Sequence, residues 1–453
     1  MFRPLLCLVS VLTLLSAPAQ SQAPRRALEH APSAWLQSLA SSPVQWLPWT
    51  DATLDHAKAG QRPVYVLVAS ELSEFSRATL RETFSRASTA EWMNTHFVCV
   101  IVDADAQPEI AAYAQQFIQS VRQLRGLPVH LWLTPDFQPY EGANYLPPSE
   151  EWGKPGFLKT ARNALDTWAQ NPERARTLAT EAQAMLQSPP LPSASAKLTQ
   201  LLERAAAGWI AAADPIHGGF GDAPKLPEPE VIQFLVRGSS EARDAGRHAA
   251  HALVTGAAHD AVHGGFFRRT LDAEWKEPYR QKTLLDQARI ARALLEAHRL
   301  GPDPVLRDAA CGALDFAWRE LRLPSGALAA ALDGTDLPDT AAPASWTKSG
   351  SATLAAHAWL LAALVEAGRS SPARSRAAIS ELRTLLLAQV RAPDGWLSHQ
   401  PHSAIEGTAT DYLAVAHALR VSETGDSNAL ANQLVQRACS RFFDATRGTF
   451  LAS

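Results

Sequence analysis

The chain of 453 residues is too long for one ordinary hydrophobic core, so we expect two domains. Its hydrophobic content of 46%, with 13 Trp and 15 Phe, is typical of a folded globular protein and excludes a disordered one. The 42 Lys and Arg residues nearly balance the 45 Asp and Glu residues, and the net charge of −3 offers no basic surface for nucleic acid.

The N-terminus predicts an export signal. Arg3 supplies a short positive start, residues 5–15 form an apolar stretch, and Ala17-Pro18-Ala19 is a small-residue cleavage site. The apolar stretch is too short to span a bilayer, so a retained membrane anchor is the weaker alternative. We therefore expect residues 1–19 to be removed, with cleavage after Ala19. The protein would then be periplasmic or secreted, with no stable membrane insertion.

Strand and helix signals alternate over residues 24–170. Apolar runs predict strands at 64–69, 97–103, 129–134 and near 140–145, and helical spacing predicts helices at 73–95, 108–124 and 152–170. This alternation predicts an α/β domain with a central sheet between helices. Pro128 directly precedes a core strand, which is where a thioredoxin-like fold places a cis proline beside its active site.

The junction after the first strand decides whether this domain could perform thiol chemistry. Thioredoxin-like proteins carry Cys-x-x-Cys at this point, and the corresponding residues here are Ser73-Glu74-Phe75-Ser76. A hydroxyl cannot form a disulfide and is not appreciably ionised near neutral pH, so a dithiol mechanism is excluded. We expect Ser73 and Ser76 to act as helix N-caps. A Ser nucleophile is the alternative, but no His lies nearby in the sequence to activate it.

The composition changes after residue 170. Residues 171–195 are rich in Pro and Ser and predict a linker. Over residues 196–453 the strand signals disappear, and helical patterns occur at 197–213, 229–238, 242–259, 283–300, 305–321, 349–368, 372–390, 408–422 and 428–443. A loop recurs between them, because DPIHGGF at 214–220 is echoed by DAVHGGF at 260–266. Paired helices joined by recurring turns predict an α/α toroid, with an irregular helical bundle as the alternative.

Motifs from both halves resemble the spermatogenesis-associated protein 20 family. SPVQWLPW at 42–49 is similar to the family's Asn-Pro-Val-Asp-Trp-x-x-Trp opening, and GGFGDAPKLP at 218–227 to its Gly-Gly-Phe-Gly-x-Ala-Pro-Lys-Phe-Pro box. RETF at 81–84, NTHFV at 94–98 and KTLLD at 282–286 occur in the family's order. The resemblance implies a thioredoxin-like domain followed by an (α/α)6 toroid similar to sugar epimerases and six-hairpin glycosidases.

The sequence departs from this family pattern at several positions. The family's Cys-x-x-Cys falls on Ser73 and Ser76, a family His on Tyr279 and a family Glu on Gln281. The helical patterns are also fewer than the twelve or so helices of a closed six-hairpin ring. We therefore expect a divergent, C-terminally shortened member whose toroid is incomplete, either open or closed by a partner.

Candidate catalytic residues lie in the second half of the chain. His217 and His263 precede the two Gly-Gly-Phe loops and could act as acid and base at one mouth of the toroid, although repeated turn chemistry explains the same placement. Two lone His residues predict no metal site. Lys282 and Asp286 are four residues apart, so we expect them to share one helix face as an ion pair or as a substrate-binding charge cluster.

Further candidates would line the same mouth of the toroid. Asp411 begins a late helix and, with Tyr412, matches a family Asp-Tyr pair. Asp222, Asp286 and Asp411 could supply the two acids of glycoside hydrolysis. Trp275 could stack on a sugar ring, although an aromatic residue in a helical repeat is more often part of the core. The predicted binding residues are Asp222, Lys225, Trp275, Tyr279 and Tyr412.

Three functions compete on this evidence. The lost family positions favour a redox-inactive binding or scaffold protein with a carbohydrate-type cleft. Retention of Lys225, Lys282, Asp286 and Asp411 keeps open a carbohydrate-active enzyme of epimerase or glycosidase type. A thiol oxidoreductase is nearly eliminated. We expect no cofactor, and either a carbohydrate ligand or a protein partner.

Overall fold

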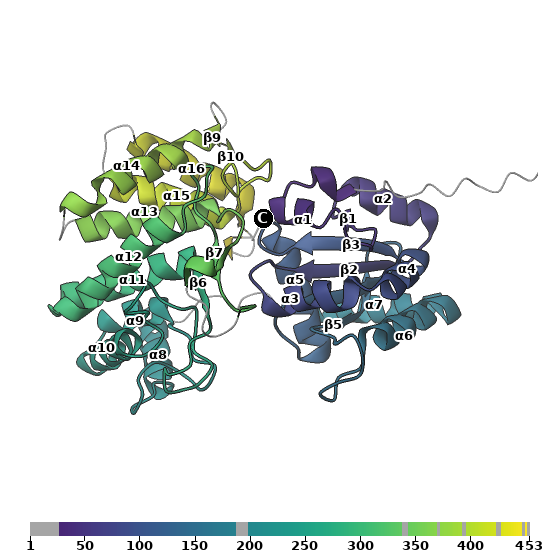
Figure 1. The fold of residues 1–453 in the computed structure, drawn as a ribbon, viewed down its shortest axis with the longest axis horizontal. Helices are drawn as coiled ribbons and strands as arrows, with labels where there is room; N and C mark the ends of the chain where they lie inside the picture. The colour runs from purple at the N-terminus through teal and green to yellow at the C-terminus, as the bar shows by residue number, and fades with distance from the viewer. Residues whose placement is uncertain are drawn as a thin grey trace, which may run out of the picture.

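The computed structural model of the chain shows two domains that lie side by side (Figure 1). It describes residues 27–186, 198–337, 343–368, 372–391, 396–422, 427–445 and 449–450. The predicted export signal at 1–19 and the last part of the predicted linker, 187–195, lie outside these residues. Among the described helices, none is both long and apolar enough to cross a membrane. We call residues 27–186 the sheet domain and the residues from 198 onward the helical domain.

The sheet domain is built on a five-stranded sheet of order β1-β3-β2-β4-β5. β1 and β2 run parallel to β3, whereas β4 pairs antiparallel with β2 and with β5. The strands are β1 (Leu47–Pro48), β2 (Val64–Ala69), β3 (Val98–Asp103), β4 (Val129–Leu133) and β5 (Pro139–Ala143). All residues of β2 and β3 are buried, because alternate side chains face two separate cores on the two sides of the sheet. The predicted thioredoxin-like arrangement is confirmed.

Helices cover both faces of this sheet. They are the 3₁₀ turn Ala27–His30, α1 (Ala34–Ser38), α2 (Asp51–Gly60), α3 (Glu74–Ala78), α4 (Ala87–His96), α5 (Pro108–Arg122), α6 (Phe157–Gln170) and α7 (Pro172–Leu186). The prediction of one continuous helix over 73–95 is wrong. α3 passes into a π-helical segment at Thr79–Phe84, and the chain breaks at Arg86, whose extended backbone (φ −75°, ψ 121°) precedes α4.

The predicted linker at 171–195 is wrong over most of its length. α7 occupies Pro172–Leu186 and consists mainly of strong helix formers such as Ala, Glu, Arg and Leu. Ala175, Ala179 and Ala182 fall on one face at helical spacing, and they are buried in the cores of the sheet domain. The segment therefore belongs to the sheet domain.

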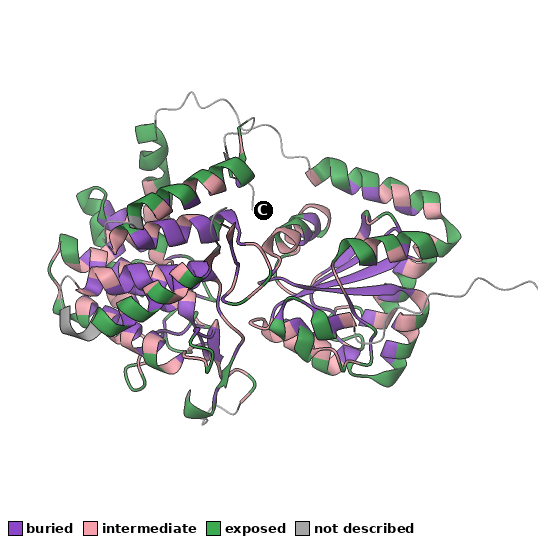
Figure 2. Cartoon of the chain, turned by 90° about the horizontal axis from the view of Figure 1, so that it is seen from above, coloured by how far each residue is buried: buried purple, intermediate pink, exposed green. Residues whose placement is uncertain are grey.

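The helical domain is a layered array of helical hairpins. Inner helices α9 (Pro229–Val236), α11 (Leu284–Leu300), α13 (Leu354–Gly368) and α15 (Ala409–Val421) pack successively on one another. Each is followed by an outer helix that packs on it: α10 (Ser240–Thr255), α12 (Pro304–Glu320), α14 (Pro372–Ala388) and α16 (Ser427–Phe442), with α8 (Leu198–Ala211) preceding them all. The inner helices are largely buried and the outer ones expose one side (Figure 2).

These helices confirm the predicted α/α toroid arrangement. Each of the predicted helical patterns corresponds to one helix from α8 to α16. α13 shows why the inner layer forms: it is apolar nearly all round, so it is stable only between other helices. In the part of the chain that the structure describes, the inner helices form an arc rather than a closed ring.

The predicted absence of strands after residue 196 is wrong. β6 (Gln281–Thr283), β7 (Ala331–Asp333) and β8 (Thr347–Lys348) form an antiparallel sheet, on the side of the helical domain that faces the sheet domain (Figure 1). A 3₁₀ turn occupies Pro343–Ser345, and two further pairs join β9 (Val390–Arg391) to β10 (Trp396–Leu397) and β11 (Phe443–Asp444) to β12 (Thr449–Phe450). Strands of two or three residues are too short to show alternation in a sequence.

Candidate functional site

The loop after β2 occupies the place of a thioredoxin redox motif. Ser73 precedes α3 and its hydroxyl accepts a hydrogen bond from Ser76 N at 3.3 Å, so its predicted N-cap role is confirmed. Ser76 is not a cap, because it already lies within the first turn and its Oγ accepts from Ser70 N at 3.3 Å. The Leu127–Pro128 peptide is cis, as predicted, and Leu127 O accepts a hydrogen bond from Ser73 Oγ at 3.3 Å.

The same loop is the contact with the helical domain. Gln281 Nε2 donates a hydrogen bond to Leu72 O at 2.9 Å, and Tyr279 OH donates to Glu74 Oε2 at 3.3 Å. Burial, followed by the nearby charge of Glu74, raises the pKa of Tyr279 to about 12. Tyr279, a predicted binding residue, therefore joins the two domains. Since Leu72 and Glu74 flank Ser73, the degenerate redox motif lies at this contact.

Arg77 on α3 adds a set of charged partners to the contact. Its guanidinium lies 3.2 Å from Asp333 on β7 and 3.0 Å from Asp336, and it donates to Thr335 Oγ1 at 2.6 Å. Arg81 lies 3.4 Å from the same Asp336. The Arg77 side chain is only 19% exposed, so water screens its ion pairs less than it screens pairs on an open surface.

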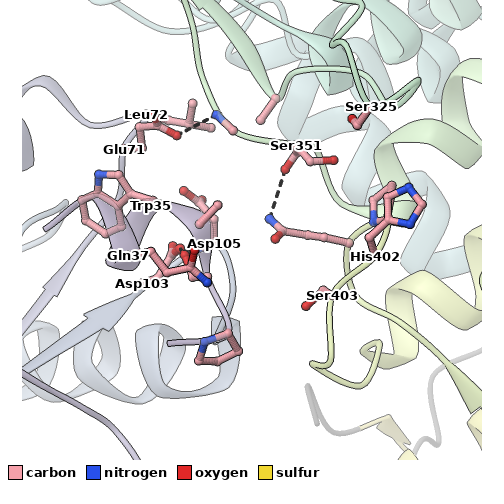
Figure 3. Close-up of a pocket in the computed structure, with 17 residues that line it drawn as sticks. Trp35, Gln37, Glu71, Leu72, Asp103, Asp105, Ser325, Ser351, His402 and Ser403 are labelled. Atoms are coloured by element: carbon pink, nitrogen blue, oxygen red, sulfur yellow. Dashed lines mark hydrogen bonds between the residues drawn. The ribbon is translucent and has the colours of Figure 1, made fainter. Parts of the chain in front are cut away.

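A pocket of about 320 Å³ lies between the two domains beside this contact (Figure 3). Gly350 N donates to Glu71 Oε2 at 2.9 Å across the domain boundary, and Gln400 Nε2 donates to Ser351 O at 3.1 Å on the helical-domain side. The volume suits a small molecule. The lining residues with polar or aromatic side chains are Ser33, Trp35, Gln37, Glu71, Asp103, Asp105, Ser325, Ser351, Gln400, His402 and Ser403.

Two aspartates at the end of β3 give the pocket an acidic wall. The Asp103 carboxylate accepts hydrogen bonds from Ser33 Oγ and, at 3.0 Å, from the backbone N–H of Asp105. Ser70 Oγ donates to Asp105 Oδ2 at 2.5 Å. Burial, and then the charge of Asp105, raises the pKa of Asp103 to about 6, and burial also raises the pKa of Asp105. Asp103 can therefore exchange a proton near neutral pH.

The sequence offered one signal for these acids. Carboxylates that directly follow a buried parallel strand lie at the edge where ligands of α/β domains bind. These acids do not form a metal site. Within the described ranges, no group of three or more His, Cys, Asp or Glu is arranged to hold a metal ion.

His399 connects the helical domain to this acidic wall. Its Nδ1 lies 2.6 Å from Asp411 Oδ2, and its Nε2 lies 2.6 Å from the carbonyl oxygen of Asp105. Since both ring nitrogens face acceptors, the imidazolium form can donate to both. Burial opposes the positive charge, but the hydrogen bond and charge of Asp411 outweigh it and raise the pKa of His399 to about 8.

Sequence reasoning missed His399. His399 is separated from Asp105 by 294 residues and from Asp411 by 12 residues, and neither spacing belongs to a recognisable sequence motif. Nothing in its local sequence distinguishes it from an ordinary His in a loop.

Known proteins are similar to this chain in both of its domains. Residues 25–187 match the family model Thioredox_DsbH, described as a protein of unknown function, DUF255. Spermatogenesis-associated protein 20 of Mus musculus is 27% identical over 325 residues, and that of Homo sapiens is 28% identical over 330 residues. Alignments of this length extend beyond the family model into the helical domain. The chain is therefore similar to spermatogenesis-associated protein 20 in both of its domains.

The likeness to these relatives is partial in length. The two matches cover 68% and 69% of this chain but 41% and 42% of the relatives, so the chain spans about two fifths of the length of the curated relatives it matches. Among solved structures, a sugar epimerase from a ruminal bacterium is similar at 16% identity and a TM-score of 0.45, covering 55% of this chain and 72% of that chain.

Lys282 and Asp286 do not form the expected helical pair, because Lys282 lies on β6 before α11 begins. The buried Lys282 Nζ donates to Asp260 Oδ2 and to Gly264 O, both at 2.7 Å. Asp286 instead lies in the first turn of α11, where its Oδ2 accepts from Oγ1 of the N-cap Thr283 at 2.6 Å and its own N–H donates to that hydroxyl oxygen at 3.0 Å. Neither residue lines the interdomain pocket.

Lys225 repeats the role of Lys282 one hairpin earlier. Its Nζ donates to Asp214 Oδ2 at 2.6 Å and to Gly218 O at 2.9 Å. The same carbonyl accepts from Trp275 Nε1 at 3.2 Å, and the Trp275 side chain is buried. Lys225 and Trp275 therefore hold the recurring loop in place. Both side chains are buried, so they are not accessible to a ligand.

His217 and His263 lie at the tips of the two recurring loops. The N–H of each donates at 2.9 Å to Oδ1 of the Asp that begins its loop, Asp214 or Asp260. Both His side chains are exposed, as is Asp222, and none of the three lines the pocket. The turn chemistry suggested by the sequence accounts for both His positions.

Asp411 and Tyr412 are buried at the start of α15. Asp411 Oδ2 accepts hydrogen bonds from Thr408 N and Thr408 Oγ1, both at 2.9 Å, and its Oδ1 accepts from Ala355 N at 2.9 Å. Tyr412 OH accepts from Leu397 N at 3.0 Å inside the core. Asp411 is therefore a capping and positioning residue, and it contacts His399, whose other ring nitrogen faces the Asp105 carbonyl oxygen.

Proposed function

We propose that this protein is a redox-inactive binding protein that holds a carbohydrate-type ligand in the pocket between its domains. The observation that carries the proposal is the composition of a cavity of about 320 Å³, which combines carboxyl, amide and hydroxyl groups with the indole of Trp35. Sugar hydroxyls donate to carboxylates and both donate to and accept from amides, while the apolar face of a sugar ring packs on an aromatic side chain. Such a lining suits a polyol ring better than an apolar ligand.

A thermal-shift screen of residues 20–453 against mono- and oligosaccharides tests this function. A ligand at a hundred times its Kd stabilises the folded state by roughly 2.7 kcal/mol, which raises the melting temperature by a few degrees. Trp35→Ala should abolish the shift, whereas Trp152→Ala, at a side chain that is 73% exposed outside the pocket, should retain it. The absence of any shift across the panel would contradict a carbohydrate ligand and point to a protein partner, to be sought by pull-down.

Redox inactivity has two supports. Ser73 and Ser76 cannot form a disulfide, and the loop that carries them is occupied by the contact with Gln281 and Tyr279. An insulin-reduction assay with dithiothreitol should therefore show no acceleration by the protein over buffer. Catalysed reduction would contradict this part of the proposal and restore the thiol oxidoreductase alternative.

A carbohydrate-active enzyme of epimerase or glycosidase type is the second candidate, and Asp103 is the observation that favours it. A carboxyl with a pKa of about 6 can donate a proton near neutral pH, and the adjacent Asp105 could serve as the partner carboxylate. Any sugar that gives a thermal shift should then be turned over, and Asp103→Asn should abolish the turnover. Sugar binding without turnover would contradict the enzyme and support the binding function.

Export is a further part of the proposal. It is supported by the charged start, apolar stretch and small-residue site within residues 1–19. Cell fractionation should find the protein in the periplasm or the medium, with Gln20 as its first residue by N-terminal sequencing. A cytoplasmic protein that begins at Met1 would contradict it.

A further inference from the structure

The interdomain pocket has more negative groups than positive ones. Glu71, Asp103 and Asp105 line it, from the loop after β2 and the end of β3, and its described lining residues include neither Lys nor Arg. His402 is the remaining titratable side chain of the lining, and it is exposed. Figure 3 shows the carboxylates on the sheet-domain side and Ser351 and His402 opposite them.

The cations near the pocket are already matched by other partners. Arg77 is paired with Asp333 and Asp336 at 3.2 and 3.0 Å, and His399 is paired with Asp411 at 2.6 Å. Arg268, which attracts Asp105 electrostatically, donates to Gln281 Oε1 at 2.8 Å. Arg268 and His399 lower the pKa of Asp105, and Arg77 lowers that of Glu71, but burial outweighs these charges. No Lys or Arg is among the described residues that line the cavity beside these carboxyl groups.

We infer that the ligand of this pocket carries a protonated amine, so that its class is an amino sugar or a short oligosaccharide with free amino groups. This inference rests on the proposed function and specifies its ligand. An ammonium group donates three hydrogen bonds and accepts none, which complements a wall of carboxylate acceptors. Charge-assisted hydrogen bonds are roughly twice as strong as neutral ones.

The remaining lining groups serve the sugar ring itself. Trp35 offers an apolar face, and Gln37 and Gln400 offer amides to neutral hydroxyls. A sugar acid would place its carboxylate against Glu71 and Asp105, and this like-charge repulsion excludes it. Burial raises the pKa values of Glu71 and Asp105. An ammonium group bound in the pocket would act in the opposite direction and favour their ionised forms.

A matched pair of ligands tests the inference by isothermal titration calorimetry on residues 20–453. The glucosamine tetramer and its fully N-acetylated counterpart share the sugar backbone and differ in the charge of their nitrogen substituents. At low salt and near neutral pH, the amine form should bind about tenfold tighter or more. The preference should fall as salt is added, because ions screen partly exposed charges.

Isosteric variants locate the effect. Glu71→Gln and Asp105→Asn keep an oxygen that can accept from Gly350 N or Ser70 Oγ, so both should fold with a circular dichroism spectrum like that of the wild type. Each should reduce the affinity for the amine form by a larger factor than it reduces the affinity for the N-acetylated tetramer. Asp55→Asn, at an exposed position on α2, is the matched control and should retain the preference.

The outcomes separate the inference from the proposed function. Equal affinity for the two tetramers, or tighter binding of the N-acetylated one, overturns the amine and leaves the carbohydrate function standing. An amine preference that survives in both Glu71→Gln and Asp105→Asn also overturns the inference, because the amine would then bind elsewhere. Binding of neither tetramer, in a protein that gives no thermal shift with any sugar, overturns both.

Discussion

Replacing His399 by Gln tests whether a buried imidazolium fastens the two domains together. In the wild type, the ring bridges Asp411 Oδ2 and the Asp105 carbonyl oxygen, each at 2.6 Å. The pKa of His399 lies at about 8, above the ordinary 6.5, so the folded protein binds this proton more tightly than the unfolded chain does. The resulting stabilisation is present in full below pH 6.5 and is lost as the pH rises through about 8.

The size of the effect follows from the two pKa values. A shift from 6.5 to about 8 corresponds to roughly 2 kcal/mol at 1.36 kcal/mol per unit. Gln is uncharged at every pH, so His399→Gln removes this pH-linked part. The raised pKa of Asp103 also makes the folded state less stable as the pH rises through about 6, but the wild type and the variant share that contribution. The difference between them should therefore shrink by about 2 kcal/mol between pH 6.5 and pH 9.

Equilibrium urea unfolding at a series of pH values measures this difference. Far-UV circular dichroism and tryptophan fluorescence should be followed together, because coincident transitions are needed to extract a single free energy of unfolding. His402→Asn is the control: His402 is an exposed residue of the same loop with a φ of 64°, which Asn tolerates. The reasoning is refuted if wild type and His399→Gln change in parallel over this pH range.

Three further substitutions test structural roles by urea unfolding. Arg77→Ala removes the ion pairs of Arg77 with Asp333 and Asp336 and should lower the free energy of unfolding by about 1–3 kcal/mol. The control Arg322→Ala breaks an exposed ion pair and should lower it by less than about 1 kcal/mol. Equal losses in the two variants would contradict a special role for the domain contact. Lys282→Ala leaves the carboxylate of Asp260 without its cation and should cost about 3–5 kcal/mol, so a melting temperature like that of the wild type would rule out its fastening role. Ser73→Ala removes the N-cap of α3 and should cost about 1 kcal/mol, and Ser73→Asp should recover most of it if capping is the cause.

Several predictions from the sequence were wrong because a local pattern does not show where a helix begins or ends. The spacing of Lys282 and Asp286 is correct for a helix pair, but the helix begins at Leu284, so the two residues belong to different elements. Likewise, the Pro- and Ser-rich composition after residue 186 extended the predicted linker back over α7, whose buried alanines carry a weak hydrophobic signal. In both cases the boundary of an element decided the outcome, and boundaries depend on capping and packing that composition does not report.

The sequence by itself determined the core strands of the sheet domain and the helices of the helical domain. The apolar run Val64–Ala69 became β2 without change of bounds, and each helical pattern after residue 196 became one helix, because burial of an apolar face follows directly from residue spacing. The repeated DPIHGGF and DAVHGGF loops likewise fold alike, each fastened by one buried Lys, because the same local turn chemistry occurs twice.

Only the tertiary structure decided where the candidate site lies. Asp103 and Asp105 come from the end of β3, whereas Ser351 and Gln400 come from loops of the helical domain, and the pocket exists only where these surfaces meet. His399 contacts Asp105 across 294 residues of sequence. Periodicity reports which face of an element is buried, but the docking of two folded domains depends on the shape and charge of whole surfaces, to which residues distant in the chain contribute.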